Sequence, residues 1–422
     1  MPVRLEQHGR HRDLACRSGM VLGPEPQMSR AVHRFDESAI LDAARAVDGL
    51  SDFGDDSFRE PLRVLLAAYA EAPIHALGAK ILHGSVVRSL ANRLRTRHWL
   101  ATHPEIADEV IEAPLVVVGM MRSGTTLLQR MLASDPRHFC VMGYESLEPA
   151  PRLGVSPDDP DPRIADAEAR EKMTREFAPE YFSIHPSYAR QAEEEIMILA
   201  DAFLSHVPEA SCDVPAYREW IDHQDFTPAY RHLRGALQLL QWEKKRRGES
   251  RGRWVLKTPA HLGYLDALLA TFPGAHVIHM HRDPVQTITS GASLNATLWR
   301  MHASDVDPAV VGRQWIRRMS WTKSRAMAAR DRRSDEAARF TDVTFRDAVA
   351  DPMGQIERIY GRVEMELTED ARRAMEVWRA ADAEVKLPKH AYTPEQFGLT
   401  DAEIRTEFAD YIERFLPSEE RA

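Results

Sequence analysis

The sequence predicts an α/β fold in which a P-loop-type parallel β-sheet is flanked by helices, with an extensive helical N-terminal layer and a helical insertion. Short apolar runs rich in β-branched residues alternate with segments whose apolar residues recur three and four positions apart. This alternation is typical of strands and helices that build a parallel sheet. The clearest unit is LVVVGMMRSGTTLLQRML at 115–132, where an apolar strand is followed by a glycine loop and a helix.

Four strands are predicted for this sheet, at 115–119, 253–257, 275–281 and 339–345. The first of them, LVVVG, is apolar throughout, as is typical of a parallel strand buried on both faces. Since open α/β sheets bind ligands at the carboxyl edge of their strands, we look for functional residues directly after each strand.

Three regions are predicted along the chain. Residues 1–37 are polar and aperiodic and are expected to form a disordered N-terminal extension. Residues 38–112 have helical periodicity throughout and are expected to form the N-terminal layer. Residues 113–422 are expected to form the α/β core, with the helical insertion at about 163–247.

The composition disfavours several classes of binding partner and cellular location. The formal net charge is −9, which disfavours a global affinity for nucleic acid or for an anionic membrane. No apolar run approaches the roughly 18 residues that a transmembrane segment needs. The cysteines, Cys16, Cys140 and Cys212, form neither a zinc pattern nor a disulfide framework, which favours a reducing compartment. We therefore expect a cytoplasmic protein.

The glycine loop GMMRSGTT lies where a phosphate-binding loop requires it, after a strand and before a helix. Its backbone N–H groups and the positive helix end can cradle an anion. The usual P-loop lysine is missing, so an ATP or GTP hydrolase is disfavoured. A terminal 5′-phosphate with a charged group beside it fits better. The candidate binding residues are Arg122, Ser123, Gly124, Thr125 and Thr126.

A second candidate anion site follows the third predicted strand. Arg282 stands at the strand end, and Ser290 lies about two helical turns further on. The guanidinium fork is suited to phosphate, and the serine adds a hydroxyl donor. Two phosphate-type sites at one sheet edge imply a nucleotide with phosphates at both ends of its ribose.

These motifs resemble those of sulfotransferases that use 3′-phosphoadenosine 5′-phosphosulfate (PAPS). RSGTTLL at 122–128 resembles their 5′-phosphosulfate loop, and RDPVQTITS at 282–290 is similar to their 3′-phosphate motif. LKTPAH at 256–261 looks like their Lys-Thr element, and VTFRDAVADPMGQIERIY like their late strand–helix segment. The resemblance covers roughly residues 45–415. Arg346 stands where the late motif usually has an acid.

The resemblance implies transfer of a sulfuryl group from PAPS to a hydroxyl or amine of a small-molecule, lipid or glycan acceptor, without a metal. Arg122 stands where many members have lysine; its fork keeps the charge but does not donate its proton, so it is expected to act electrostatically. Lys257 is the second candidate for stabilising the transferred group. Glu145 and His261 remain alternative general bases.

The sequence leaves several other assignments open. One of the glutamates at 193–195 could face the acceptor. Trp254, Tyr264 and Trp299 are alternatives for stacking on adenine. Lys389 and His390 either close over the cofactor or belong to an ordinary loop. A homo-oligomer is compatible with the sequence. The alternative functions are a P-loop-type kinase of a small molecule and a non-catalytic nucleotide-binding protein.

Overall fold

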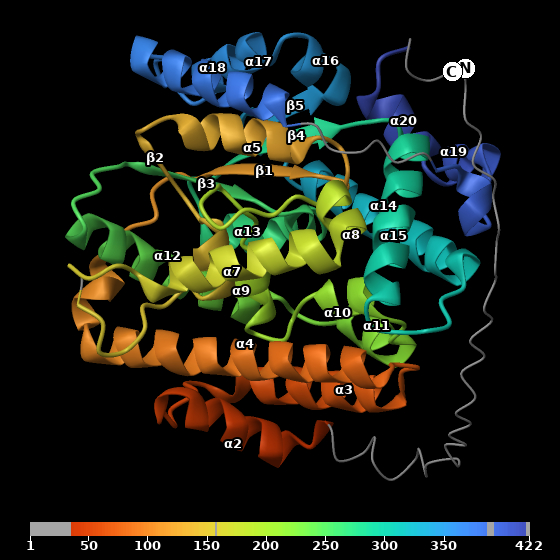
Figure 1. The fold of residues 1–422 in the computed structure, drawn as a ribbon. Coiled ribbons are helices and arrows are strands. Elements are labelled where there is room, and N and C mark those ends of the chain that lie inside the picture. Colours follow the sequence, from red (N-terminus) through yellow and green to blue (C-terminus); the bar gives the residue numbers. More distant parts are fainter. Residues whose placement is uncertain (1–34, 157, 386–391, 419–422) are drawn as a thin grey trace, which may run out of the picture.

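In the computed structural model, which describes residues 35–156, 158–385 and 392–418, one parallel β-sheet forms the centre of the α/β core (Figure 1). Its five strands lie in the order β2-β3-β1-β4-β5. They are β1 (Leu115–Gly119), β2 (His138–Cys140), β3 (Arg253–Lys257), β4 (His276–His281) and β5 (Phe340–Thr344). The predicted α/β class is confirmed. The additional strand β2 has only three residues, too few for a recognisable pattern.

The strand register aligns the carboxyl ends of the central strands. Val117 of β1 lies opposite Lys257 of β3 and Ile278 of β4, and Gly119 lies opposite Met280. The glycine loop, Lys257 and Arg282 therefore emerge at the same edge of the sheet, where ligands bind in open α/β sheets.

Helices cover both faces of the sheet, because alternate residues of the buried strands point to opposite sides. Leu115 and Val117 pack against one group of helices, and Val116 and Val118 against another. The first group is α5 (Thr125–Ser134), α16 (Phe345–Ala350), α17 (Pro352–Arg362) and α18 (Glu369–Glu384), above the sheet in Figure 1. The second includes α12 (Thr227–Arg246), α13 (Leu265–Thr271), α14 (Pro284–Arg300) and α15 (Pro308–Asp331).

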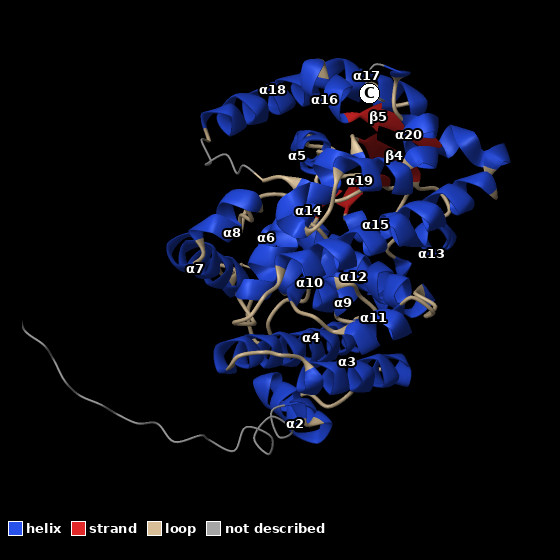
Figure 2. Cartoon of the chain, turned by 90° about the vertical axis from the view of Figure 1, so that its right-hand side faces the viewer, coloured by secondary structure: helices blue, strands red, loops and turns tan. Residues whose placement is uncertain are grey.

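The N-terminal helices form a layer on the far side of the inserted helices, as Figures 1 and 2 both show. The layer consists of α2 (Glu37–Asp48), η2 (Asp56–Phe58), α3 (Arg59–Glu71), α4 (Ala76–Thr102) and η3 (Pro104–Asp108). The segment expected to be disordered lies mainly outside the described residues. Its last part is ordered, since Phe35 is buried and Asp36 caps α2 by accepting from Ala39 N at 2.8 Å.

Helices of 5 to 16 residues build the region between the N-terminal layer and the sheet. They are α6 (Gly143–Leu147), α7 (Pro162–Phe177), α8 (Pro179–Ile184), α9 (Ile196–Ala200), α10 (Val207–Ser211) and α11 (Pro215–Ile221). The remaining elements are η4 (Pro259–Tyr264), η5 (Ser334–Arg339), η6 (Pro394–Phe397), α19 (Asp401–Glu407) and α20 (Ala409–Phe415). None of the helices in the described ranges is both long and apolar enough to span a bilayer. The division into domains stays a prediction.

Candidate active site

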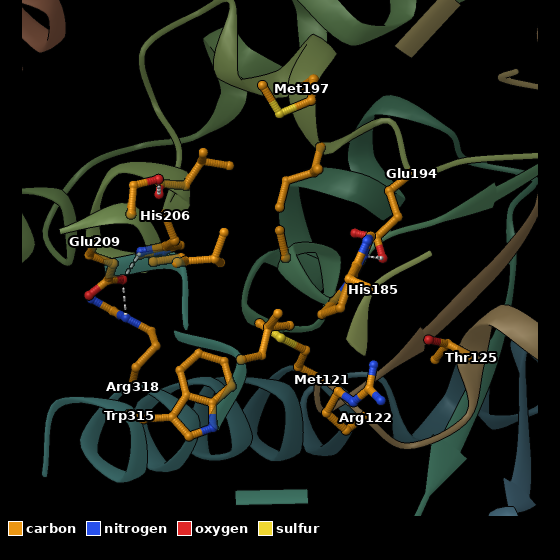
Figure 3. Close-up of a pocket in the computed structure, with 18 of the residues that line it drawn as sticks. Met121, Arg122, Thr125, His185, Glu194, Met197, His206, Glu209, Trp315 and Arg318 are labelled. Atoms are coloured by element: carbon orange, nitrogen blue, oxygen red, sulfur yellow. Dashed lines mark hydrogen bonds and ion pairs between the residues drawn. The ribbon is translucent and has the colours of Figure 1, made fainter. Parts of the chain in front are cut away.

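A cavity of about 650 Å³ lies at the carboxyl edge of the sheet, between the glycine loop and the inserted helices. Figure 3 shows Arg122 and Thr125 of the loop on one side, with His185 and Glu194 above them. His206, Glu209 and Arg318 lie on the opposite side. The cavity therefore joins the predicted phosphate loop to a second, distal group of polar residues.

Two glycines give the loop its shape. Gly124 has a φ of +90° and precedes α5, so its N–H and those that follow face the anion position of a helix N-terminus. A Cβ at Gly119 would come within 2.4 Å of Ser123 Oγ, so this glycine allows the loop to fold back on β1. Arg122 adopts a φ of +74°, which is uncommon outside glycine.

Replacing Gly124 by alanine should destabilise the loop. The left-handed backbone disfavours a side chain by about 1–2 kcal/mol, and the new Cβ would lie 2.6 Å from the ring of Phe345. We expect the free energy of unfolding to fall by at least about 1 kcal/mol, measured by urea denaturation. Gly84→Ala, in open space on α4, is the control and should be neutral or stabilising. If Gly124→Ala and Gly84→Ala had equal free energies of unfolding, the left-handed backbone at Gly124 would not strain a side chain.

The predicted phosphate-binding residues are brought together. Arg122 donates from Nε to Ser290 Oγ at 3.1 Å and from Nη1 to the carbonyl of Ile184 at 2.9 Å. Arg282 donates from Nη1 to the carbonyl of Arg122 at 2.9 Å and stacks over Phe345, 4.0 Å from the ring centroid. Burial lowers the pKa of both arginines from the ordinary value. The two predicted anion sites are thus one continuous group.

Lys257 ends β3 beside a carboxylate that lines the cavity. It is only 2% exposed, and its Nζ donates to Glu194 Oε1 at 2.5 Å. His185 Nε2 lies 3.9 Å from the same oxygen. Burial would raise the pKa of Glu194, but Lys257 and His185 outweigh it and hold the pKa at about 2. The predicted lysine is therefore not itself part of the described cavity wall, but it contacts the wall through Glu194.

The structure does not bring His261 into the cavity. This side chain is completely buried, with its Nε2 2.5 Å from Glu195 Oε1 and its Nδ1 2.8 Å from the Tyr230 hydroxyl, both at hydrogen-bond distance. Glu195 also accepts from the backbone N of Lys257 at 3.1 Å. Both ring nitrogens are thus occupied by core groups, so the placement of His261 supports a structural role and not that of a base.

The placement of Glu145 also departs from the expectation. The residue is 1% exposed, and its Oε1 accepts from Lys244 Nζ at 2.5 Å and from Tyr144 at 2.9 Å. Its Oε2 accepts from Met142 N at 2.9 Å, which closes the first turn of α6. In the described chain, the cavity wall includes its neighbours Gly143 and Ser146 but not Glu145.

Of two further functional candidates, His185 was not predicted from the sequence, and Glu194 was predicted only as one of the three glutamates at 193–195. The run at 193–195 did indicate that a glutamate could face the acceptor, and Glu193 and Glu194 both line the cavity. His185 follows α8 in a segment without periodicity, so no sequence signal marked it. Side-chain atoms of His185, Glu193 and Glu194 lie close enough together to bind one metal ion. However, Glu194 already forms an ion pair with Lys257.

The candidates for adenine stacking are dispersed. Trp254 is buried beside Gln241, Trp299 donates to the carbonyl of Glu209, and Tyr264 lines the distal part of the cavity. Lys389 and His390 lie outside the described residues. The stacking partner therefore stays a prediction.

The sequence of residues 114–370, which includes the glycine loop and the strands of the sheet, matches the model of the sulfotransferase family. The chain belongs to this family. It is therefore a sulfotransferase, an enzyme that transfers a sulfuryl group from a donor to an acceptor. Membership favours this activity over both a small-molecule kinase and a non-catalytic nucleotide-binding protein.

Mycobacterial sulfotransferases are similar over most of the chain. The crystal structure of STF1 from Mycobacterium tuberculosis H37Rv is 32% identical, with a TM-score of 0.77 over 89% of this chain and 98% of that one. STF9 from Mycobacterium avium is 25% identical, with a TM-score of 0.81 over 92% and 98%. The omega-hydroxy-beta-dihydromenaquinone-9 sulfotransferase Stf3 of Mycobacterium bovis is 26% identical over 318 residues, 70% of this chain and 74% of Stf3.

Proposed function

We propose that this sulfotransferase takes its sulfuryl group from PAPS and transfers it to a hydroxyl group of an apolar, lipid-like acceptor. The observation that carries the donor assignment is the direct linkage of the two predicted anion sites. Arg122 bonds Ser290, and Arg282 bonds the backbone of Arg122, so one nucleotide with phosphates at both ends of its ribose could contact both.

The residues present fit a phosphate at the loop. Ser123 Oγ is fully buried and has no hydrogen-bond partner within the described ranges. The left-handed Gly124 leaves the start of α5 open to an anion. Ser123, Gly124, Thr125 and Thr126 would hold the 5′-phosphate, and Arg282 and Ser290 the 3′-phosphate. When bound, PAPS would supply the electrophilic sulfuryl group and a phosphate leaving group.

The protein's own part in the reaction is electrostatic stabilisation and proton removal. Arg122 and Lys257 place positive charge beside the loop, where negative charge develops on the sulfuryl and leaving-group oxygens. Glu194 accepts the proton of the acceptor hydroxyl as the new oxygen–sulfur bond forms and the bond to the 5′-phosphate breaks. With a pKa of about 2, Glu194 is a weak base, so it takes the proton late, once sulfur has acidified the hydroxyl.

The lining of the cavity supports an apolar acceptor. Its walls include Leu82, Met121, Ile196, Met197, Leu298 and Trp315. Its volume lies in the range of small-molecule sites, about 300–1,000 Å³. Stf3 is named for an omega-hydroxylated menaquinone. We infer that this chain likewise takes an apolar alcohol, with its hydroxyl beside Glu194.

The assignment is tested first by binding and then by turnover. Thermal-shift titration with 3′-phosphoadenosine 5′-phosphate (PAP), the product nucleotide, should stabilise the protein, and mass spectrometry should detect gain of one SO₃ unit on apolar alcohols. Stabilisation by ATP with magnesium but not by PAP would contradict the donor assignment.

Arg282→Ala should weaken PAP binding by about ten- to a hundredfold, because a hydrogen bond to a charged group contributes about 1.5–3 kcal/mol. Calorimetric titration measures the change. Arg234→Ala is the matched control, since Arg234 is an exposed arginine on α12 that lines no described cavity. This control should bind PAP within about threefold of wild type. Equal affinity of Arg282→Ala and wild type would remove the 3′-phosphate assignment.

A further inference from the structure

The end of the cavity opposite Arg122 is closed by a buried ion-pair network. Glu209, on α10, is 2% exposed and pairs with Arg318 Nε at 2.6 Å (Figure 3). Arg318 Nη1 pairs with Asp222 at 2.5 Å, and Arg218 Nε donates to Glu209 at 3.0 Å. Glu209 and Arg318 are thus buried at the centre of this network, and Asp222 and Arg218 are partly exposed at its edge.

A second cavity of about 410 Å³ lies on the other side of this network. Arg318 and Trp321 line both cavities. The second cavity also includes Glu403 and Glu407, whose side chains are exposed, so it leads toward the surface. The two side chains that line both spaces, Arg318 and Trp321, therefore come from one stretch of α15.

Arg318 and Trp321 are packed against their neighbours. The Arg318 guanidinium lies 4.7 Å from the centroid of the Trp321 ring, and Arg325 lies 4.8 Å from the same ring. Tyr264 packs edge-on against Trp321 at 5.7 Å. Moving Arg318 would break its ion pairs with both Glu209 and Asp222, and breaking a buried ion pair is strongly unfavourable. An acceptor that reaches the wall would therefore meet side chains that are costly to displace.

We propose that Arg318 and Trp321 determine the length of acceptor that the enzyme takes. The acceptor places its hydroxyl at Glu194, lies along the apolar walls and ends against the Trp321 ring. Chains that are too long for this span would have to enter the second cavity and are rejected. The inference rests on the proposed function and adds to it a limit on the size of the acceptor.

The test is an acceptor-length profile. Primary alcohols from octanol to hexadecanol, in detergent, are compared for kcat/KM with PAPS and for binding to the PAP-loaded enzyme by fluorescence titration. Trp321→Ala joins the two cavities, and we expect the ratio of hexadecanol to octanol to rise about tenfold in both measurements. Trp321→Leu is made in parallel in case the alanine variant does not fold, and should shift the ratio in the same direction.

Trp378→Ala is the matched control, because Trp378 is partly buried on α18 and lines neither cavity within the described chain. The hexadecanol-to-octanol ratio of Trp378→Ala should equal that of wild type in both measurements. A Trp321 variant that loses activity equally for all lengths would show a merely structural role and overturn the inference, as would a wild type that binds none of these alcohols. Binding with a shifted profile but no sulfuryl transfer would support the length limit and contradict the proposed function.

Discussion

Replacing Arg122 by alanine is expected to lower kcat for sulfuryl transfer by about a hundred- to a thousandfold, the range found when one donor to a developing oxyanion is removed. Arg122 is the loop side chain that links the two anion sites, through its hydrogen bond to Ser290, and it also donates to the carbonyl of Ile184. Steady-state kinetics with PAPS and an accepted alcohol give the value. Arg234→Ala, an exposed position on α12, is the control and should leave kcat unchanged.

Arg122→Lys refines this prediction. Lysine keeps the charge but loses the fork that reaches Ser290 and Ile184 together. We expect kcat between those of wild type and Arg122→Ala. Full activity in Arg122→Ala would show that the charge of Lys257 is sufficient, and the electrostatic role of the loop arginine would then be rejected.

Glu194→Gln is expected to lower kcat by about a hundredfold or more while PAP binds as in wild type, since loss of a general base typically costs about 10²–10⁴ in rate. The amide retains an oxygen for Lys257 Nζ but removes the charge that balances this buried ammonium, so the free energy of unfolding should also fall by about 3 kcal/mol. Single-turnover kinetics and PAP titration separate the chemical step from binding.

Glu145→Gln distinguishes the two candidate bases. Because Glu145 is buried against Lys244, this change should lower the free energy of unfolding by about 3 kcal/mol but leave kcat of the folded enzyme near that of wild type. The reverse result, a stable Glu145→Gln enzyme with a large loss of kcat and an active Glu194→Gln, would return the base role to Glu145.

The pH dependence of kcat follows from the depressed pKa of Glu194. With a pKa of about 2 the carboxylate stays charged until the solution becomes strongly acidic. Because Glu194 stays able to accept a proton, kcat should not fall through protonation of this residue between about pH 8 and pH 5. An acidic limb of kcat near the ordinary histidine range, removed by His185→Ala, would instead identify His185 as the base.

The parts of the site that could be predicted from sequence are those set by contiguous segments. LVVVG followed by GMMRSGTT determines both a buried strand and the loop after it, and Arg282 with Ser290 lies on the next strand and its helix. Parallel topology then places both at one sheet edge, as observed. Strand β2 was missed because its three residues gain their strand character only from pairing with β3.

The choice of base depended on partners distant in the chain. Glu145 is paired with Lys244, 99 residues away in the chain, and His261 contacts Glu195, 66 residues away. Glu194 is positioned by Lys257, 63 residues further on. Local spacing carries no information about such pairs, because tertiary packing decides which carboxylate is buried in the core and which faces the cavity.

The most direct test of the central claim is a calorimetric titration of the wild-type protein with PAP and with adenosine 5′-monophosphate, which differ only in the 3′-phosphate. If the glycine loop holds the 5′-phosphate while Arg282 and Ser290 hold the 3′-phosphate, PAP should bind about a hundredfold more tightly, corresponding to about 3 kcal/mol. Equal affinities for the two nucleotides would contradict the account.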